Sequence, residues 1–322
     1  MSHYLTKENL FYTLATAAFG WTINQGFELK SYVDYLKIES PECTERNPNM
    51  LQLFFGMILI QLCLQYPVQA IAKSLFLSSL PDKFPRGSKI RIEKAEMMSE
   101  RVYKFFIYAA TTGCLFFVLK QSNFLHTYLW GDQADPQYFA NYPCQKIPKY
   151  LDDIYVIKLA YHTYELVYTL LFQYDRRDFP EYILHHIVTM SLILFSYSVN
   201  FLPIGGVIMI IHDLPDCLVC IYKITADVMG PKIQYSAAAA MFLSWIYFRL
   251  WFFPYQTIYM YYQQVAHSTH YVISNVFWII FVFLCFLEIL HLFWFHLMIK
   301  GIINRLTNKE KNKIFNAKDK YE

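Results

Sequence analysis

Residues 176–216 read RRDFPEYILHHIVTMSLILFSYSVNFLPIGGVIMIIHDLPD, and this stretch decides how the rest of the chain is interpreted. It holds two apolar runs, each close to the length of a membrane span, separated by a turn at Asn200 and Pro203. Five titratable side chains nevertheless stand inside these runs: His185, His186, His212, Asp213 and Asp216. A charged group within a bilayer costs roughly 2.5–3.5 kcal/mol on insertion scales, so it indicates a functional site by default. Five of them in two neighbouring helices predict a buried reaction centre.

The composition extends the membrane interpretation to the whole chain. The 322 residues are 56% hydrophobic and 16% charged, whereas a soluble chain usually carries about 25% charged residues. Windows long and apolar enough for a span lie at 50–77, 102–121, 151–173, 181–199, 204–224, 235–262 and 273–300. A weaker window, 8–24, is broken by polar side chains and is interpreted as an interfacial helix in preference to a span. We therefore predict an all-α polytopic transmembrane helix bundle with about seven or eight spans.

Basic residues are unevenly distributed along the sequence. They gather in segment 78–101, in the turn at 175–181, which includes Arg176 and Arg177, and in the tail after residue 300. Since basic loops stay on the cytoplasmic side, this pattern predicts a multi-pass protein with a cytosolic C-terminus. The N-terminus lacks the pattern of a removable signal peptide. No motif indicates a nucleic-acid partner.

The chain has seven cysteines, of which two are interpreted as core residues and two as a candidate disulfide. Cys217 and Cys220 have redox-motif spacing but lie in a predicted span, so we interpret them as core residues. Cys43 and Cys144 both fall in loops on the predicted lumenal side. A disulfide between them is compatible with an oxidising compartment.

The histidines and aspartates form a pattern that suits acid–base or nucleophilic chemistry. Asp216 lies four residues after His212 and three after Asp213, so it shares a helix face with both. An imidazole beside a carboxylate acts as a general base or a nucleophile. The alternative is that these groups only hydrogen-bond between helices and hold the bundle together. A di-iron site would need several histidine boxes, whereas this chain has one HH pair, so no metal is expected.

Further ionisable residues stand in other predicted spans. Three of them, Lys158, His162 and Glu165, lie in the 151–173 window. Arg249 is a candidate to hold a phosphate, a carboxylate or Asp213, or else only to pair with a buried acid. His291 and Glu288 are three residues apart and are equally consistent with satisfying each other. We take His212, Arg249 and His291 as candidate substrate-binding residues.

Several matched blocks resemble the Lag1 motif of ceramide synthases, in the TLC (TRAM–Lag1–CLN8) superfamily. They are R-x-D-F-x-E-x-x-x-H-H-x-V-T, F-S-Y-S-x-N and G-x-x-x-x-x-x-H-D-x-x-D, then NYP at 141–143, RLWFFP at 249–254 and LEILHLFWFHLMIKG at 287–301. The resemblance covers roughly residues 95–303 and implies a six-span TLC-type catalytic bundle there. It leaves 1–94 as an N-terminal region with one clear span and a basic cytosolic linker, and 304–322 as a basic cytosolic tail.

What the resemblance implies is N-acylation of a sphingoid base by a fatty acyl-CoA to give ceramide. His185 and His186 match the essential histidine pair, and Asp213 and Asp216 match the motif aspartates. His185 is then the expected carrier of the acyl group as an acyl-imidazole, with His186 as the alternative, while an aspartate orients or protonates. Acyl-CoA is the co-substrate, and no further cofactor is implied.

The sequence also departs from the family pattern and leaves alternatives open. Pro215 stands where the motif usually has a small polar residue, and a proline there removes a backbone hydrogen bond. The final residues, KDKYE, resemble a retrieval signal for the endoplasmic reticulum membrane. A catalytically silent membrane protein of the same fold, or an acyltransferase with another acceptor, remains an alternative. The sequence also leaves open a homodimer or a small single-span regulatory subunit.

Overall fold

The computed structural model describes residues 7–39, 48–122, 124–125, 127–130, 144, 147–174, 178–266 and 271–307. Over these ranges the chain forms helices and no strand, which confirms the predicted all-α fold. The elements in chain order are α1 (Lys7–Glu39), α2 (Met50–Ser79), α3 (Lys89–Leu119), the short η1 (Thr127–Leu129), α4 (Leu151–Phe172), α5 (Phe179–Ser198), α6 (Leu202–Thr225), α7 (Pro231–Ser244), the π-helical η2 (Trp245–Ile258), α8 (Tyr259–Ala266) and α9 (Tyr271–Thr307).

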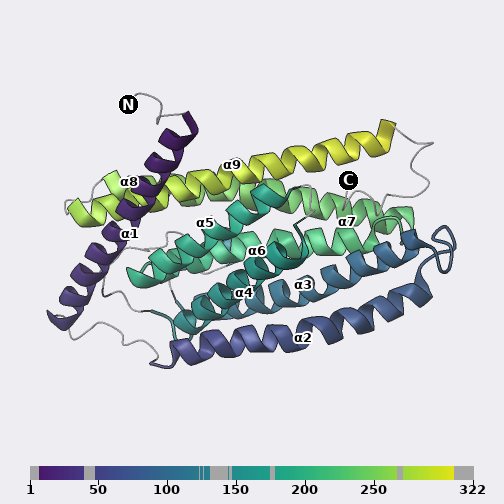
Figure 1. Ribbon diagram of the computed structural model, residues 1–322, viewed down its shortest axis with the longest axis horizontal. Coiled ribbons are helices and arrows are strands. Elements are labelled where there is room, and N and C mark those ends of the chain that lie inside the picture. Colours follow the sequence, from purple (N-terminus) through teal and green to yellow (C-terminus); the bar gives the residue numbers. More distant parts are fainter. Residues whose placement is uncertain are drawn as a thin grey trace.

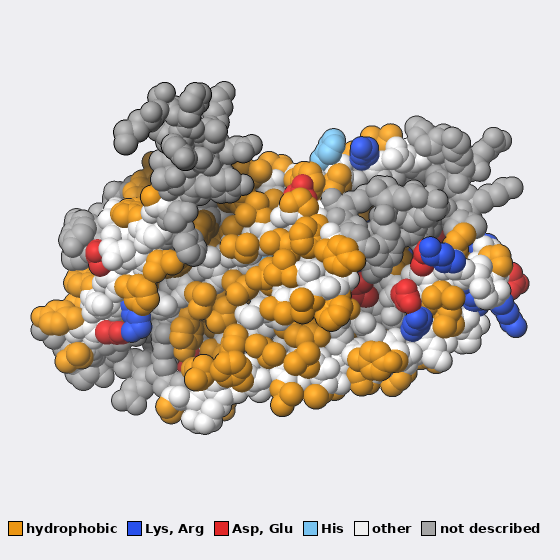
Figure 2. Space-filling model, viewed as in Figure 1, with side chains coloured by type: hydrophobic (Ala, Val, Ile, Leu, Met, Phe, Trp, Pro, Cys, Tyr) orange, Lys and Arg blue, Asp and Glu red, His pale blue; other side chains and the backbone are white. Residues whose placement is uncertain are grey.

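The helices form an elongated bundle with a lipid-compatible surface. In Figure 1 the passes α2, α3, α4, α5, α6, α7–η2–α8 and α9 lie side by side, and successive passes run in opposite directions. Hydrophobic side chains cover the middle of the face in Figure 2, and charged side chains gather toward its ends. Within the described ranges, five helical segments are long and apolar enough to cross a membrane: Met50–Ser79, Lys89–Leu119, Leu202–Thr225, Pro231–Gln263 and Ser274–Asn304. The chain is therefore a multi-pass membrane protein.

Two predicted spans, α4 and α5, fall outside this set although they are 22 and 20 residues long. Buried charges such as Lys158 and Glu165 lower the hydropathy of α4, and the histidine pair does the same for α5. Their place inside the bundle lets these groups be satisfied by neighbouring helices rather than by lipid. The total of seven or eight spans stays a prediction, since length and composition support five.

The N-terminal helix is longer than the sequence suggested. Helix α1 continues to Glu39, well past the window 8–24. Leu29 and Val33 are fully buried in the main core, and Gln25 accepts a hydrogen bond of 2.7 Å from Asn275 of α9. These contacts stabilise the part of α1 that lies beyond the window 8–24. Figure 1 shows α1 crossing the bundle obliquely, and α1 is not among the candidate spans; its interfacial placement stays a prediction.

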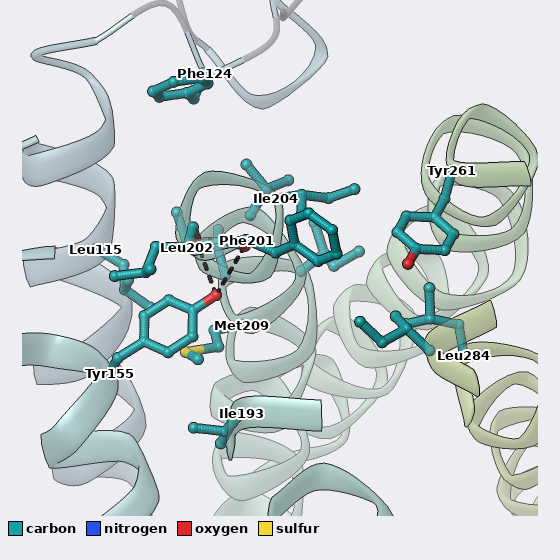
Figure 3. Packing of buried hydrophobic residues seen from close by; sticks show 14 of the residues in the cluster. Leu115, Phe124, Tyr155, Ile193, Phe201, Leu202, Ile204, Met209, Tyr261 and Leu284 are labelled. Carbon is teal, nitrogen blue, oxygen red and sulfur yellow. Dashed lines mark hydrogen bonds between the residues drawn. The ribbon is translucent and has the colours of Figure 1, made fainter. Parts of the chain in front are cut away.

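One contact fixes α4 against the start of α6. The Tyr155 hydroxyl donates to the carbonyls of Leu202 at 3.0 Å and Phe201 at 3.4 Å (Figure 3). A Cβ added to Gly205 would lie 1.8 Å from that hydroxyl oxygen, so only glycine fits there. Asn200 has a φ of 65° in the tight turn that sends α6 back along α5. The two motif helices are therefore adjacent and antiparallel, as predicted.

One end of the bundle is rich in basic residues. We call it the basic end; it carries the α2–α3 and α6–α7 connections and the C-terminal end of α9 (right in Figure 1). Arg91 pins the α2–α3 connection by donating to the carbonyls of Leu77, Leu80, Pro81 and Phe84. The predicted boundary at residue 94 falls inside α3, where Lys94 donates to the carbonyl of Ala226 at 2.9 Å. The three-part division of the chain stays a prediction.

Where the structure describes the cysteines, their state agrees with the interpretation made from the sequence. Cys217 and Cys220 are buried free thiols, which confirms their interpretation as core residues. Cys144 is disulfide-bonded, whereas its expected partner Cys43 lies outside the described residues. The basic turn residues Arg176 and Arg177 and the KDKYE tail also lie outside them.

Candidate active site

A cavity of about 740 Å³ lies inside the bundle, among α3 to α9. Ligand pockets typically enclose about 300–1,000 Å³. Six of the seven predicted site residues line this cavity: His185, His186, His212, Asp213, Asp216 and Arg249. The structure thus brings together side chains from α5, α6 and η2 that the sequence could only place on separate helices.

The cavity changes character along its length. At the basic end its lining carries four cationic side chains against two acidic ones, Glu93 and Asp178; the cations are Lys94, Arg101, Lys223 and Lys300. We call this part the mouth. Toward the other end the lining is mostly apolar and includes Phe201, Ile204, Gly205, Tyr261, Ile280 and Leu284. We call this part the apolar half. The histidines and aspartates lie between the two.

Helical geometry gives the depth of the apolar half. Trp294 of α9 touches His185, with ring centroids 5.4 Å apart, and Ile280 lies fourteen residues earlier on the same helix. At 1.5 Å per residue, the apolar half extends about 21 Å beyond the histidine pair. The hydrocarbon core of a bilayer is about 30 Å thick, or about 15 Å for each layer of acyl chains. The apolar half is therefore deep enough for a long acyl chain.

Asp213 is held by a buried ion pair. Both of its carboxylate oxygens lie 2.7 Å from the Lys158 ammonium of α4, and the Thr111 hydroxyl of α3 donates to it at 2.8 Å. The side chains of Lys158 and Asp213 are 1% and 6% exposed. Sequence analysis named Lys158 only as one of three ionisable residues in the 151–173 window. The pairing joins α3, α4 and α6 at the level of the reaction centre.

Asp216 takes a different partner, which lies on η2. Arg249 donates to it at 2.7 Å and to the backbone carbonyl of His212 at 2.8 Å. The guanidinium also lies over the Trp245 ring, 4.1 Å from its centroid. Among the alternatives, pairing with a buried acid is therefore confirmed, but that acid is Asp216 and not Asp213. Asp216 keeps 30% of its side chain exposed to the cavity, so it remains accessible.

Arg249 belongs to the π-helical segment η2, which interrupts the span expected over 235–262. Pro254 within the segment has no N–H to donate, and wide turns of this kind are frequent at functional sites. Helix α6, in contrast, runs unbroken through Pro215. The departure from the family motif at that position therefore leaves Asp213 and Asp216 on one continuous helix.

The histidine pair has two distinct environments. His186 is 3% exposed and its Nδ1 lies 3.3 Å from Nδ1 of His162 on α4. The Tyr182 ring packs on it at 4.6 Å between centroids. His185 is half-buried, and its buried Nδ1 has no hydrogen-bond partner among the described residues. His185 is therefore the more accessible of the two rings.

The rings of His212 and His291 pack against each other, tilted by 48°. Their ring centroids are 4.9 Å apart, and His212 lines the cavity whereas His291 does not. Nδ1 of His212 lies 2.6 Å from the carbonyl of Ile208. His291 is completely buried and lies 3.2 Å from Glu288. The interpretation that Glu288 and His291 pair with each other is confirmed, and a contact of His291 with substrate stays a prediction.

A second buried ion cluster lies nearer the mouth. The Lys104 ammonium of α3 donates to Glu165 of α4 at 2.7 Å and to the Tyr182 hydroxyl of α5 at 3.1 Å, and it lies 3.6 Å from Glu100. Tyr182 also donates to Glu165 at 3.2 Å. These contacts tie the helix of the histidine pair to α3 and α4.

Sequence analysis missed Lys158, His162 and Lys104 as parts of the site. A signal was present on α4, because residues 158, 162 and 165 follow the four- and three-residue spacing of one helix face. Lys104 has Glu100 four residues earlier on its own helix, but nothing in the sequence indicates its partner Glu165 on α4. Among the described side chains, no group of three or more His, Cys, Asp and Glu residues is arranged to hold a metal ion.

Known proteins are similar to this chain over much of its length. The family model described as TLC domain matches residues 97–300. Mouse ceramide synthase 4 is 33% identical over 224 residues, which cover 69% of this chain and 54% of the mouse protein. ASC1-like protein 3 from rice is 25% identical over 286 residues, covering 85% and 95% of the two chains. Ceramide synthase LOH2 from Arabidopsis thaliana is 26% identical over 272 residues, covering 80% and 86%. The chain thus spans about half the length of the mouse relative and most of the two plant relatives.

Proposed function

The chain belongs to the TLC domain family and is similar to ceramide synthases, and we propose that it is itself a ceramide synthase. The reaction is transfer of a fatty acyl group from acyl-CoA to the amine of a sphingoid base. One observation carries the proposal: the cavity joins a cationic mouth, the histidine pair and a deep apolar half in that order. This order matches the polyanionic CoA, the thioester and the acyl chain of the substrate.

The chemistry follows from the positions of the two histidines. The neutral ring of His185 attacks the thioester carbonyl, the C–S bond breaks, and CoA leaves as a thiolate that takes up a proton. The sphingoid amine then attacks the acyl-imidazole, the new C–N bond forms, and the His185 ring is released. His186 accepts the proton that the amine loses. Such splitting of one difficult transfer into two steps is typical of nucleophilic catalysis.

The aspartates contribute through their cationic partners. Asp213 is neutralised by Lys158, so its main effect is to hold α4 and α6 in register beside the histidines. Asp216 is paired with Arg249 but accessible, which suits it to orient the incoming amine. The reaction needs no resident cofactor, because the thioester itself supplies the activated acyl group.

The arrangement also supports a location and an orientation. The mouth lies at the basic end, and basic loops remain cytosolic. We therefore place the mouth and the C-terminus on the cytosolic side of the endoplasmic reticulum membrane. Acyl-CoA would then enter from the cytosol, and its chain would occupy the apolar half.

The direct test is an assay of microsomes that contain the expressed protein. Labelled sphinganine and a panel of acyl-CoAs from medium to very long chain are supplied, and ceramide is measured for the wild type and for His185→Ala. Ceramide that disappears in the variant at equal expression supports the proposal. A well-folded wild type that forms no ceramide with any acyl-CoA would contradict it. Acylation of another amine or alcohol instead would identify the acceptor as the mistaken part.

A further inference from the structure

A third histidine stands beside the motif pair. His162 of α4 is 8% exposed and lines the cavity. Its Nδ1 lies 3.3 Å from Nδ1 of His186, and its ring centroid is 5.4 Å from that of His186 and 6.4 Å from that of His185. The matched motif blocks do not include this residue, and the reaction as proposed above gives it no role.

The contact between two ring nitrogens restricts the tautomers. A hydrogen bond between two Nδ1 atoms requires that one ring carries its proton there and the other a lone pair. If His162 donates, a neutral His186 must carry its proton on Nε2. If His186 donates, its lone pair lies on Nε2. Only the second arrangement makes Nε2 of His186 a base.

We propose that His162 is a positioning residue that accepts a hydrogen bond from Nδ1 of His186 and so keeps Nε2 of His186 as the proton acceptor. The inference rests on the proposed acyl transfer and deepens it. When His186 takes the amine proton on Nε2, it becomes an imidazolium that still donates from Nδ1 to His162. The partner of a ring nitrogen commonly fixes the tautomer and orientation of a functional histidine.

The surroundings of His162 make it a rigid partner. Lys158, four residues earlier, is fixed to Asp213 of α6, and Glu165, three residues later, is fixed to Lys104 of α3. The two buried ion pairs hold α4 on either side of His162. The Tyr182 ring also packs on His186, at 4.6 Å between ring centroids. The hydrogen bond is therefore formed between two side chains whose positions are already constrained.

Two polar substitutions separate positioning from simple packing. The amide oxygen of asparagine is separated from Cα by the same number of bonds as Nδ1 of histidine. His162→Asn can therefore still accept a hydrogen bond from Nδ1 of His186. In His162→Gln the amide oxygen lies one bond further from Cα. It cannot take the position of Nδ1 without displacing the His186 ring. His162→Leu fills a similar volume without any hydrogen bond. His296 is exposed on the outer surface of α9, so His296→Leu is the matched control.

The experiment measures kcat and KM for acyl-CoA in microsomes, with the melting temperature of each purified variant as a check on folding. We expect His162→Leu and His162→Gln to lower kcat by about 10–100-fold, as loss of such supporting partners does elsewhere, with KM nearly unchanged. His162→Asn is expected to keep most of kcat, and His296→Leu all of it.

Three outcomes would overturn the inference: full kcat in His162→Leu, an equal loss in Asn and Gln variants, or a change confined to KM. If His162→Leu fails to fold, the comparison of Asn with Gln still decides, because both are polar and similar in size. A wild type without ceramide synthesis would refute the proposed function instead, so the two failures are distinguishable.

Discussion

Removing Lys158 should be among the most damaging single substitutions outside the histidine pair. The Lys158 ammonium contacts both oxygens of Asp213 at 2.7 Å, and both side chains are almost completely buried. Lys158→Met would leave a buried carboxylate whose one remaining donor, among the side chains that the structure describes, is the Thr111 hydroxyl. Breaking a buried pair in this way costs about 3–5 kcal/mol of stability. We therefore expect a large drop in the melting temperature of the purified protein.

The double variant Lys158→Met with Asp213→Leu should recover most of that stability. Replacing both members of a buried ion pair by apolar residues is often neutral, since no unpaired charge remains. Thr111 would stay satisfied, because its hydroxyl also donates to the carbonyl of Ile107 at 3.0 Å. If Asp213 also takes part in the reaction, the double variant will fold normally and still form no ceramide. If activity returns with stability, the role of Asp213 is structural.

Lys73→Met is the matched control for this prediction. Lys73 pairs with Glu96 at 2.5 Å between α2 and α3, but the two side chains are 34% and 46% exposed. An exposed pair contributes less than about 1 kcal/mol. Melting is followed by intrinsic fluorescence in detergent for all variants under identical conditions. If Lys158→Met had the same melting temperature as Lys73→Met, the argument from burial would be refuted.

Three further substitutions test other parts of the cavity. Arg249→Lys keeps the charge but loses the stacked, forked geometry over Trp245, so ceramide synthesis should fall about tenfold or more while expression stays normal; an unchanged rate would contradict the assigned role. Gly205→Ala should lower the melting temperature, because overpacking against the Tyr155 hydroxyl costs about 1–3 kcal/mol of stability. A melting temperature equal to that of the wild type would show that the hydroxyl moves aside freely. Leu284→Phe narrows the apolar half and should shift the product toward shorter acyl chains when acyl-CoAs compete; an unchanged product spectrum would place the acyl chain elsewhere.

The location of the site was predictable because its signals are local in the sequence. His185 and His186 are adjacent, and His212, Asp213 and Asp216 fall within one and a half helical turns. Polar groups at such spacing inside apolar runs require partners, and a tight turn requires their helices to be neighbours. Both conditions follow from the chain without knowledge of its packing. The structure accordingly brings these five side chains to one cavity.

The partners of these residues were not predictable, because they depend on how the helices rotate against one another. Asp213 and Asp216 share a helix face, yet one pairs with Lys158 of α4 and the other with Arg249 of η2. The sequence left Arg249 with several alternatives because the π-helical segment around it has no local signature beyond Pro254. Hydropathy likewise undercounts α4, since it treats Lys158 as an exposed charge although the residue is neutralised within the bundle.

The most direct measurement of the central claim is the mass of the enzyme after incubation with acyl-CoA alone. The purified protein, kept at neutral pH without a sphingoid base, is digested rapidly and analysed by mass spectrometry. We predict one added acyl group on the peptide that contains His185, released as ceramide when sphinganine is supplied, and absent in His185→Ala. An active enzyme that shows no acylated peptide, or one acylated at another residue, would contradict acyl transfer through the histidine pair.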